Sequence, residues 1–155
     1  MSTHTDHYGF EFITSNPNAA KAYDKGARSF VAWRADTMEH LNAAIVADPL
    51  FIMPKILKAW ILHGGRTSKY GPTINTLLNE ITQNIDSADS RERALIDALK
   101  EANAGNPQTG AATLEAHLAT NPSDLVAHRL LQFELFWCGE SNWMREIAER
   151  AAPAW

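Results

Sequence analysis

Apolar residues recur at spacings of three and four along most of the chain. Examples are Leu95, Leu99 and Ala102 in one segment and Leu131 and Leu135 in another. This spacing places them on one face of an α-helix. Alternation of apolar and polar residues, which would indicate strands, is nearly absent. The pattern predicts eight helices, over residues 18–34, 37–47, 54–63, 72–85, 90–104, 107–120, 125–138 and 142–151.

Glycines mark the ends of several predicted helices. Gly64, Gly105 and Gly139 follow apolar helices, and glycine suits the left-handed conformation that ends a helix. Ser90 is a weak N-cap candidate, because a capping box would place an acid or amide where Arg93 stands. The connections are only a few residues long. Consecutive helices are therefore expected to pack as antiparallel hairpins.

The glycines and prolines also indicate a repeat. Gly105 and Gly139 lie 34 residues apart, each between two predicted helices, and 34 residues is the period of the tetratricopeptide repeat. Placing Pro122 at the end of one unit defines a repeat over 91–124. The same register at Pro49 defines a repeat over 18–51, because a proline forces the preceding residue out of the helical conformation.

Together these signals predict the fold class. We expect an all-α protein, an α-α superhelix or tetratricopeptide-like solenoid of about four antiparallel helix hairpins. The repeats would span 18–51, 52–90, 91–124 and 125–155 of a single domain, after a tail over 1–15. The repeat is degenerate, since Ala94 stands where a bulky residue is usual and His117 where a small one is usual.

Three stretches resemble the amino-terminal part of the tetratricopeptide repeat protein 38 family: 14–33, 43–62 and 90–155. They carry Ala20 and Asp24 before Trp33, then "DPLFIM" from Asp48, and a closing "PAW" that ends at Trp155. The resemblance covers nearly the whole chain and implies an α-solenoid. It implies no catalytic residues. Family members continue with further repeats after the Pro-x-Trp, whereas this sequence stops there.

A solenoid that stops at this point would leave its last hairpin uncovered, because terminal repeats normally need a polar outer face. Trp143, Ile147 and Trp155 are then candidates for an exposed apolar interface at an uncapped C-terminal end. A second copy of the chain, giving a homodimer, or another partner would cover it. The alternatives are that Trp155 folds back as a cap, or that the chain is a fragment.

Composition restricts the function classes. Apolar residues make up 45% and charged residues 21%, no apolar run reaches membrane-spanning length, and the N-terminus lacks a signal-peptide pattern. Cys138 is the one cysteine, which fits a reducing cytoplasm. The net charge of −4 and the scattered lysines and arginines argue against nucleic acid. We expect a cytoplasmic protein with neither a membrane nor a nucleic-acid partner.

Aromatic side chains are the strongest candidates for binding. In the repeat register, helix A of each hairpin lines the concave face. A groove there would take an apolar peptide or small ligand, with Arg129 meeting a carboxylate. The alternative is that these aromatics fill the core between helices. The candidate groove residues are Tyr23, Phe30, Trp60, His63, Arg129, Phe133 and Trp137.

Histidines offer one possible metal site. Most lie far apart and show no helical metal-ligand spacing. At the N-terminus, removal of Met1 would allow a free amine, two amides and His4 to form a square-planar Cu(II) or Ni(II) chelate. The alternative is a disordered tail that binds metal only incidentally. No cofactor motif is present, and no catalytic set stands out.

The sequence therefore favours a scaffold or binding module over a catalyst. We expect it to bind a peptide, a partner protein or a second copy of itself through stacked hairpins. The competing hypothesis is a small-molecule-binding protein or enzyme with a site in the aromatic groove. A third is a structural or vestigial fragment.

Overall fold

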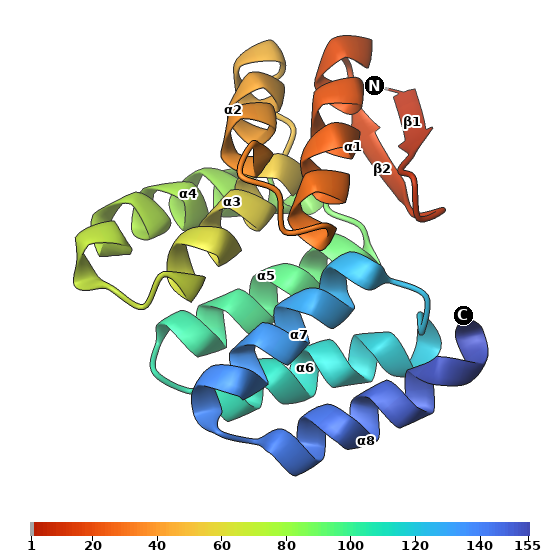
Figure 1. Ribbon diagram of the computed structural model, residues 1–155. Coiled ribbons are helices and arrows are strands. Elements are labelled where there is room, and N and C mark those ends of the chain that lie inside the picture. Colours follow the sequence, from red (N-terminus) through yellow and green to blue (C-terminus); the bar gives the residue numbers. More distant parts are fainter. Residues whose placement is uncertain (1) are drawn as a thin grey trace. The chain divides into compact units, whose positions relative to one another are not determined.

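The computed structural model describes residues 2–155 and is mostly helical (Figure 1). Within this range the chain forms eight α-helices and one two-stranded sheet. The helices are α1 (Pro17–Val31), α2 (Thr37–Ala47), α3 (Met53–Gly64), α4 (Gly71–Gln83), α5 (Ser90–Asn103), α6 (Pro107–Thr120), α7 (Leu125–Cys138) and α8 (Ser141–Ala151). Short 3₁₀ helices η1 (Ser68–Tyr70), η2 (Ile85–Ser87) and η3 (Ala152–Ala154) join or follow them. The predicted helix count is confirmed, and the bounds of α2, α6 and α7 match the expected ones.

The helices group into two compact units, Met1–Glu92 and Arg93–Trp155. In the first unit α1 packs against α2 and α3 against α4, and α2 also contacts α3. In the second unit α7 packs against both α6 and α8. The boundary falls in the first turn of α5, within three residues of the expected join between the repeats over 52–90 and 91–124. The expectation of one domain remains a prediction.

Within the expected tail over 1–15, residues 2–14 instead form a β-hairpin. Strand β1 (Ser2–Thr5) pairs antiparallel with β2 (Glu11–Thr14), with Ser2 opposite Thr14. Phe12 and Thr14 are buried while the residues between and before them are exposed. Four-residue strands are too short for the alternation of apolar and polar residues to stand out in the sequence, so the sequence pattern predicts no strand here.

One buried carboxylate organises the tip of this hairpin. Asp6 accepts hydrogen bonds from the backbone amides of Tyr8 and Phe10, at 3.0 and 2.9 Å. Its other oxygen lies 3.1 Å from a guanidinium nitrogen of Arg91, which also stacks over the Phe10 ring at 4.6 Å. The hairpin is therefore tied to the start of α5 by a buried ion pair.

A second carboxylate connects the hairpin to the join between α2 and α3. The Asp48 carboxylate accepts hydrogen bonds from the hydroxyls of Thr14 and Ser15, at 2.5 and 3.0 Å. It also accepts hydrogen bonds from the backbone amides of Ser15 and Leu50. Burial alone would raise the pKa of Asp48, but these hydrogen bonds outweigh it and lower the pKa. The Asp-Pro break is thus both a helix end and an anchor for β2.

The two proline joints have the same local geometry. In both 48–51 and 121–124, the amide of the last residue donates to the carbonyl of the first, with N···O distances of 3.1 and 3.0 Å. Proline is the second residue of each turn. His117, in the last turn of α6, is buried beside the second joint. Its Nε2 lies 2.9 Å from Oδ2 of Asp124, the last residue of that joint. This contact explains why a large residue is tolerated where a small one was expected.

The turns at Gly105 and Gly139 are also equivalent. Both glycines are left-handed, with φ of 93° and 75°. Each glycine amide donates to the carbonyl three residues before it, at 3.2 and 3.1 Å, and the next amide donates to the carbonyl five residues back, at 2.9 and 3.0 Å. This pair of bonds is a Schellman motif. The left-handed conformation predicted for these two glycines is confirmed.

Two other helix ends depart from the expectation. Gly64 lies inside α3, and the left-handed residue after it is Arg66, with φ of 48°. At the end of α1 the left-handed position is held by Trp33, with φ of 56°.

The N-cap of α5 is Asp89 rather than Ser90. The Glu92 amide donates to the Asp89 carboxylate at 2.7 Å, and the Asp89 amide donates to the Glu92 carboxylate at 3.0 Å, which is the reciprocal pair of a capping box.

Replacing either turn glycine with alanine is expected to destabilise the protein by about 1 kcal/mol, because a left-handed backbone strains any residue with a Cβ. A Cβ at Gly105 or Gly139 would meet no atom within 4 Å, so the backbone alone sets this cost. Urea denaturation measures it. Gly71→Ala is the matched control, since its φ of −50° suits alanine and its Cβ also meets nothing. A cost at one turn and none at the other would contradict their equivalence.

Candidate functional site

The candidate site is one side of α7, a helix that is fixed at both ends. The Asp124 carboxylate accepts the Ala127 amide at 3.1 Å at its start, and the Gly139 turn closes its end. One face of α7 is buried because its side chains are largely apolar, and it contributes Val126, Ala127, Leu130, Leu131 and Leu135 to the core. The side chains of α7 outside this core include Arg129, Phe133, Phe136 and Trp137.

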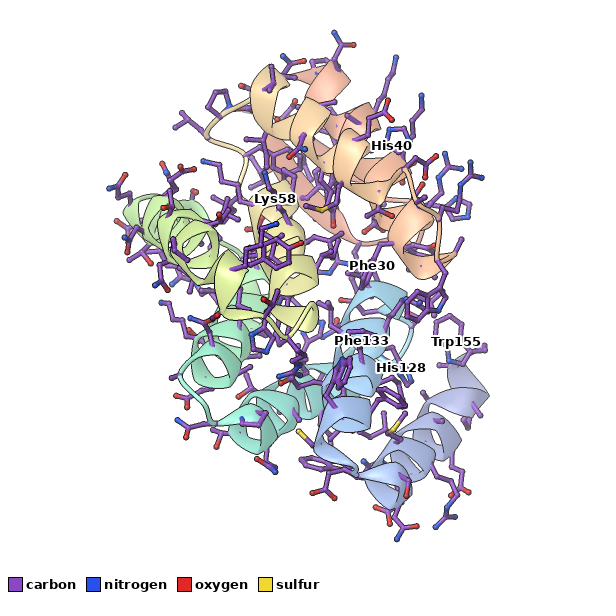
Figure 2. The ribbon with its side chains drawn as sticks, turned by 60° about the vertical axis from the view of Figure 1, so that its left-hand side comes forward. Phe30, His40, Lys58, His128, Phe133 and Trp155 are labelled. Atoms are coloured by element: carbon purple, nitrogen blue, oxygen red, sulfur yellow. The ribbon has the colours of Figure 1, made fainter. Side chains whose placement is uncertain are left out.

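The last two turns of α7 carry three aromatic rings, of which Trp137 contacts the other two. The Trp137 ring lies edge-on to Phe133 at 6.1 Å and to Phe136 at 5.6 Å between centroids. Phe136 is 60% exposed and Trp137 51% exposed, while Phe133 is half-buried. Figure 2 shows the Phe133 side chain leaving α7. We refer to Phe133, Phe136 and Trp137 as the aromatic cluster.

Arg129 lies one helical turn before Phe133 on the same side of α7. Burial lowers the pKa of its guanidinium below the usual value, and the side chain is half-buried. An arginine shifted in this way is still a cation near neutral pH. Arg129, Phe133 and Trp137, spaced four residues apart, therefore form a stripe with a charged start and an aromatic end. The structure brings these three predicted residues together on one helix.

The other predicted groove residues belong to the first unit, and two of them are core residues. Tyr23 is fully buried, with its ring 4.9 Å from Phe12 and 5.4 Å from Phe51 between centroids. Trp60 is also buried and lies edge-on to His63 at 5.8 Å. The groove assignment of Tyr23 and Trp60 is therefore wrong, because helical spacing alone does not distinguish an aromatic core from an aromatic groove.

Phe30 and His63 are half-buried, so each presents part of its ring to solvent. Phe30 is labelled near the end of α1 in Figure 2. His63 belongs to the last turn of α3.

A hollow in the second unit lies between α6 and α8, beside α7. It measures about 520 Å³ and is lined by small or apolar residues of α6 and α8, among them Ala112, Ala116 and Ile147. His128 of α7 also lines it, and burial lowers the pKa of this histidine. The Glu115 carboxylate at its rim contacts the Arg150 guanidinium. No pattern in the sequence predicts this hollow, because its lining residues come mainly from three helices, α6, α7 and α8.

The side chains expected at the C-terminal end differ in exposure. Ile147 is buried, 3% exposed, and belongs to the core. Trp143 is half-buried and its indole nitrogen donates to the Glu115 carboxylate at 2.8 Å. Trp155 is 58% exposed. Most exposed residues of α8 are polar, including the ion-paired Arg145 and Glu149, so the expected bare apolar end reduces to Trp155.

His4, the expected metal ligand, lies in strand β1 opposite Phe12. Its ring stacks on Phe12 at 5.8 Å, and its Nε2 lies 3.0 Å from the Ser2 hydroxyl. Chelation by the N-terminal amides would require β1 to leave the ladder. The metal site remains a prediction, one that competes with this strand pairing.

Among residues 2–155, no three His, Cys, Asp or Glu side chains come close enough together to hold a metal ion. Over the same residues, no helix combines the length and the apolar character needed to cross a bilayer.

Comparison with known proteins returned no matching family model, and no solved structure matches significantly.

Proposed function

We propose that the protein is a tandem helix-hairpin module, similar to a tetratricopeptide solenoid, that binds a peptide segment of a partner protein. The equivalent glycine turns and the equivalent proline joints support a repeated hairpin. The observation that carries the binding role is the aromatic cluster. Phe136 and Trp137 are half-exposed or more at the end of a helix whose opposite face is core.

The geometry suits recognition of an apolar side chain beside a carboxylate. Rings that meet edge-to-face are rigid, so packing a partner residue against them has a low entropic cost. Aromatic residues of this kind dominate binding energies in protein interfaces. Arg129, two turns before Trp137 on the same side of α7, places a cation within reach of an acidic group on the same peptide.

A second copy of this chain is the other partner that the sequence suggests. Trp155 remains the exposed apolar side chain of the expected C-terminal interface. A small-molecule or enzymatic role in the aromatic groove, and a purely structural role, likewise stay hypotheses.

Trp137→Ser is expected to weaken peptide binding at least tenfold, because an anchoring aromatic residue typically contributes about 2 kcal/mol or more. The measurement is a selection of random peptides on the intact protein, followed by titration of the selected peptides against each variant. We expect the selected peptides to combine aromatic or aliphatic residues with Asp, Glu or a free carboxyl terminus.

Trp33→Ser is the matched control, since Trp33 is an exposed tryptophan of the other unit. It should change affinity less than about twofold, and urea denaturation should show that both variants are folded. Peptides that bind Trp137→Ser and the unmodified protein equally well would refute the proposed site.

A further inference from the structure

A cationic hollow lies in the first unit. It measures about 410 Å³ and lies where α1 ends and α2 begins. Figure 2 labels His40 on α2, beside this region. Its polar lining residues come from α1, from the turn that follows and from the start of α2: Lys25, Arg28, Ser29, Arg34, Asp36 and His40. We refer to the cavity lined by these six residues as the cationic hollow.

Positive charge exceeds negative charge among the lining residues. Lys25, Arg28 and Arg34 are permanent cations, and Asp36 is the lining carboxylate. Asp36 accepts from Arg34 at 3.3 Å and lies 3.5 Å from the His40 ring nitrogen. A hydrogen bond from the Ser29 hydroxyl makes the largest contribution to lowering the pKa of Asp36, so this carboxylate is charged.

The arginines are held by carboxylates that an anion can replace. Arg28 contacts Asp24 at 3.4 Å, and its side chain is 47% exposed. Arg34 contacts Asp36 at 3.3 Å and is 67% exposed. Exposed pairs of this kind are weak, because solvent screens them. A dianion entering between the two arginines would exchange weak contacts for charge-assisted bonds.

Arginine guanidinium groups match the geometry of phosphate oxygens, and lysine adds a mobile cation. Ser29 is buried, 5% exposed, so its hydroxyl is held at the wall of the hollow. The size of the hollow falls within the range of pockets for small ligands. We propose that the cationic hollow binds a phosphate monoester, with Lys25, Arg28 and Arg34 contacting the phosphate oxygens.

Isothermal titration calorimetry at low salt tests this site, with inorganic phosphate and phosphoserine as the probes and serine as the uncharged-group control. We expect saturable binding of both phosphates and none of serine. Arg34→Gln and Lys25→Gln should each weaken phosphoserine binding at least about fivefold, because each removes one charge-assisted contact. A phosphoserine-containing peptide, titrated in parallel, distinguishes a free metabolite from a protein-borne phosphate by which of the two binds more tightly.

Lys21→Gln is the matched control. Lys21 is exposed on α1, one turn before Lys25, and does not line the hollow. It should change the affinity less than about twofold, because an exposed ammonium group that makes no contact with the phosphate interacts with it only weakly through water. Asp36→Asn removes the lining carboxylate and is expected to tighten binding. Equal weakening by Lys21→Gln and Arg34→Gln, weakening by Asp36→Asn, or no saturable binding would each overturn the proposal.

Discussion

Arg91→Met is expected to lower the free energy of unfolding by about 3–5 kcal/mol, because it leaves the Asp6 carboxylate buried without its cation. Both side chains of this pair are almost inaccessible, at 5% exposure for Arg91 and 0% for Asp6. The substitution also removes the cation stacked over the Phe10 ring. Urea denaturation at neutral pH measures the loss.

Arg145→Met provides the matched control for this prediction. Arg145 forms an ion pair of nearly the same length with Glu149, at 2.9 Å, but both side chains are more than 60% exposed. Its loss should cost less than about 0.5 kcal/mol, as is usual for exposed pairs four residues apart on a helix. The double variant Asp6→Asn/Arg91→Met should recover part of the stability, because it removes both charges. If Arg91→Met costs no more than Arg145→Met, then Asp6 does not hold the hairpin to α5.

The stability of the protein is expected to fall by about 3 kcal/mol between pH 4.5 and pH 7 because of Glu92. Burial raises the pKa of this carboxyl from 4.5 to about 7. The Asp89 charge raises it further, while the Asp89 amide and Arg91 oppose the shift. Glu92 also faces a cavity of about 30 Å³ that the Asp48 carboxylate lines.

Stability falls with rising pH because the folded state binds the Glu92 proton more tightly than the unfolded chain does. The folded state holds the Glu92 proton to about pH 7, whereas the unfolded chain releases it near 4.5. The stabilisation is therefore complete below pH 4.5 and is lost as the pH rises to 7. Glu92→Gln retains an acceptor for the Asp89 amide and cannot ionise. It should match the unmodified protein at pH 4.5 and exceed its stability by about 3 kcal/mol at pH 8.

Urea denaturation of both proteins at the two pH values checks this difference. Glu146→Gln serves as the control, because Glu146 is exposed on α8 and its substitution should change stability by less than about 0.5 kcal/mol at either pH. A Glu92→Gln variant whose advantage is the same at pH 4.5 and pH 8 would show that Glu92 is not held protonated by the fold.

Much of the helical pattern was predictable because its signals are local. The start of α6 at Pro107 and the end of α7 at Cys138 follow from proline geometry and from a left-handed glycine, which act on the backbone nearby. The N-terminal hairpin was not predictable in this way. Its Asp6 meets a partner 85 residues later in the chain. No local pattern in residues 1–15 predicts that contact.

The candidate sites likewise contain residues that helical spacing groups together and residues that only tertiary contacts bring together. Arg129, Phe133 and Trp137 share a side of α7 by helical spacing, so the sequence was sufficient to group them. Tyr23 follows a similar spacing yet is core, because Phe12 and Phe51 pack against it from distant segments. The cationic hollow needs the α1–α2 turn to bring Arg34 and His40 to the same place as Lys25 and Arg28.

The amino-acid sequence by itself determined that this chain is mostly helical, where most of its helices begin and end, and that two glycine turns and two proline joints recur. These features depend on backbone torsions and on contacts within a few residues. Only the tertiary structure decided which aromatics are buried, that the first residues form a strand pair, and which charges share a cavity. Those outcomes depend on desolvation and on contacts between segments far apart in the chain, which spacing along the sequence does not encode.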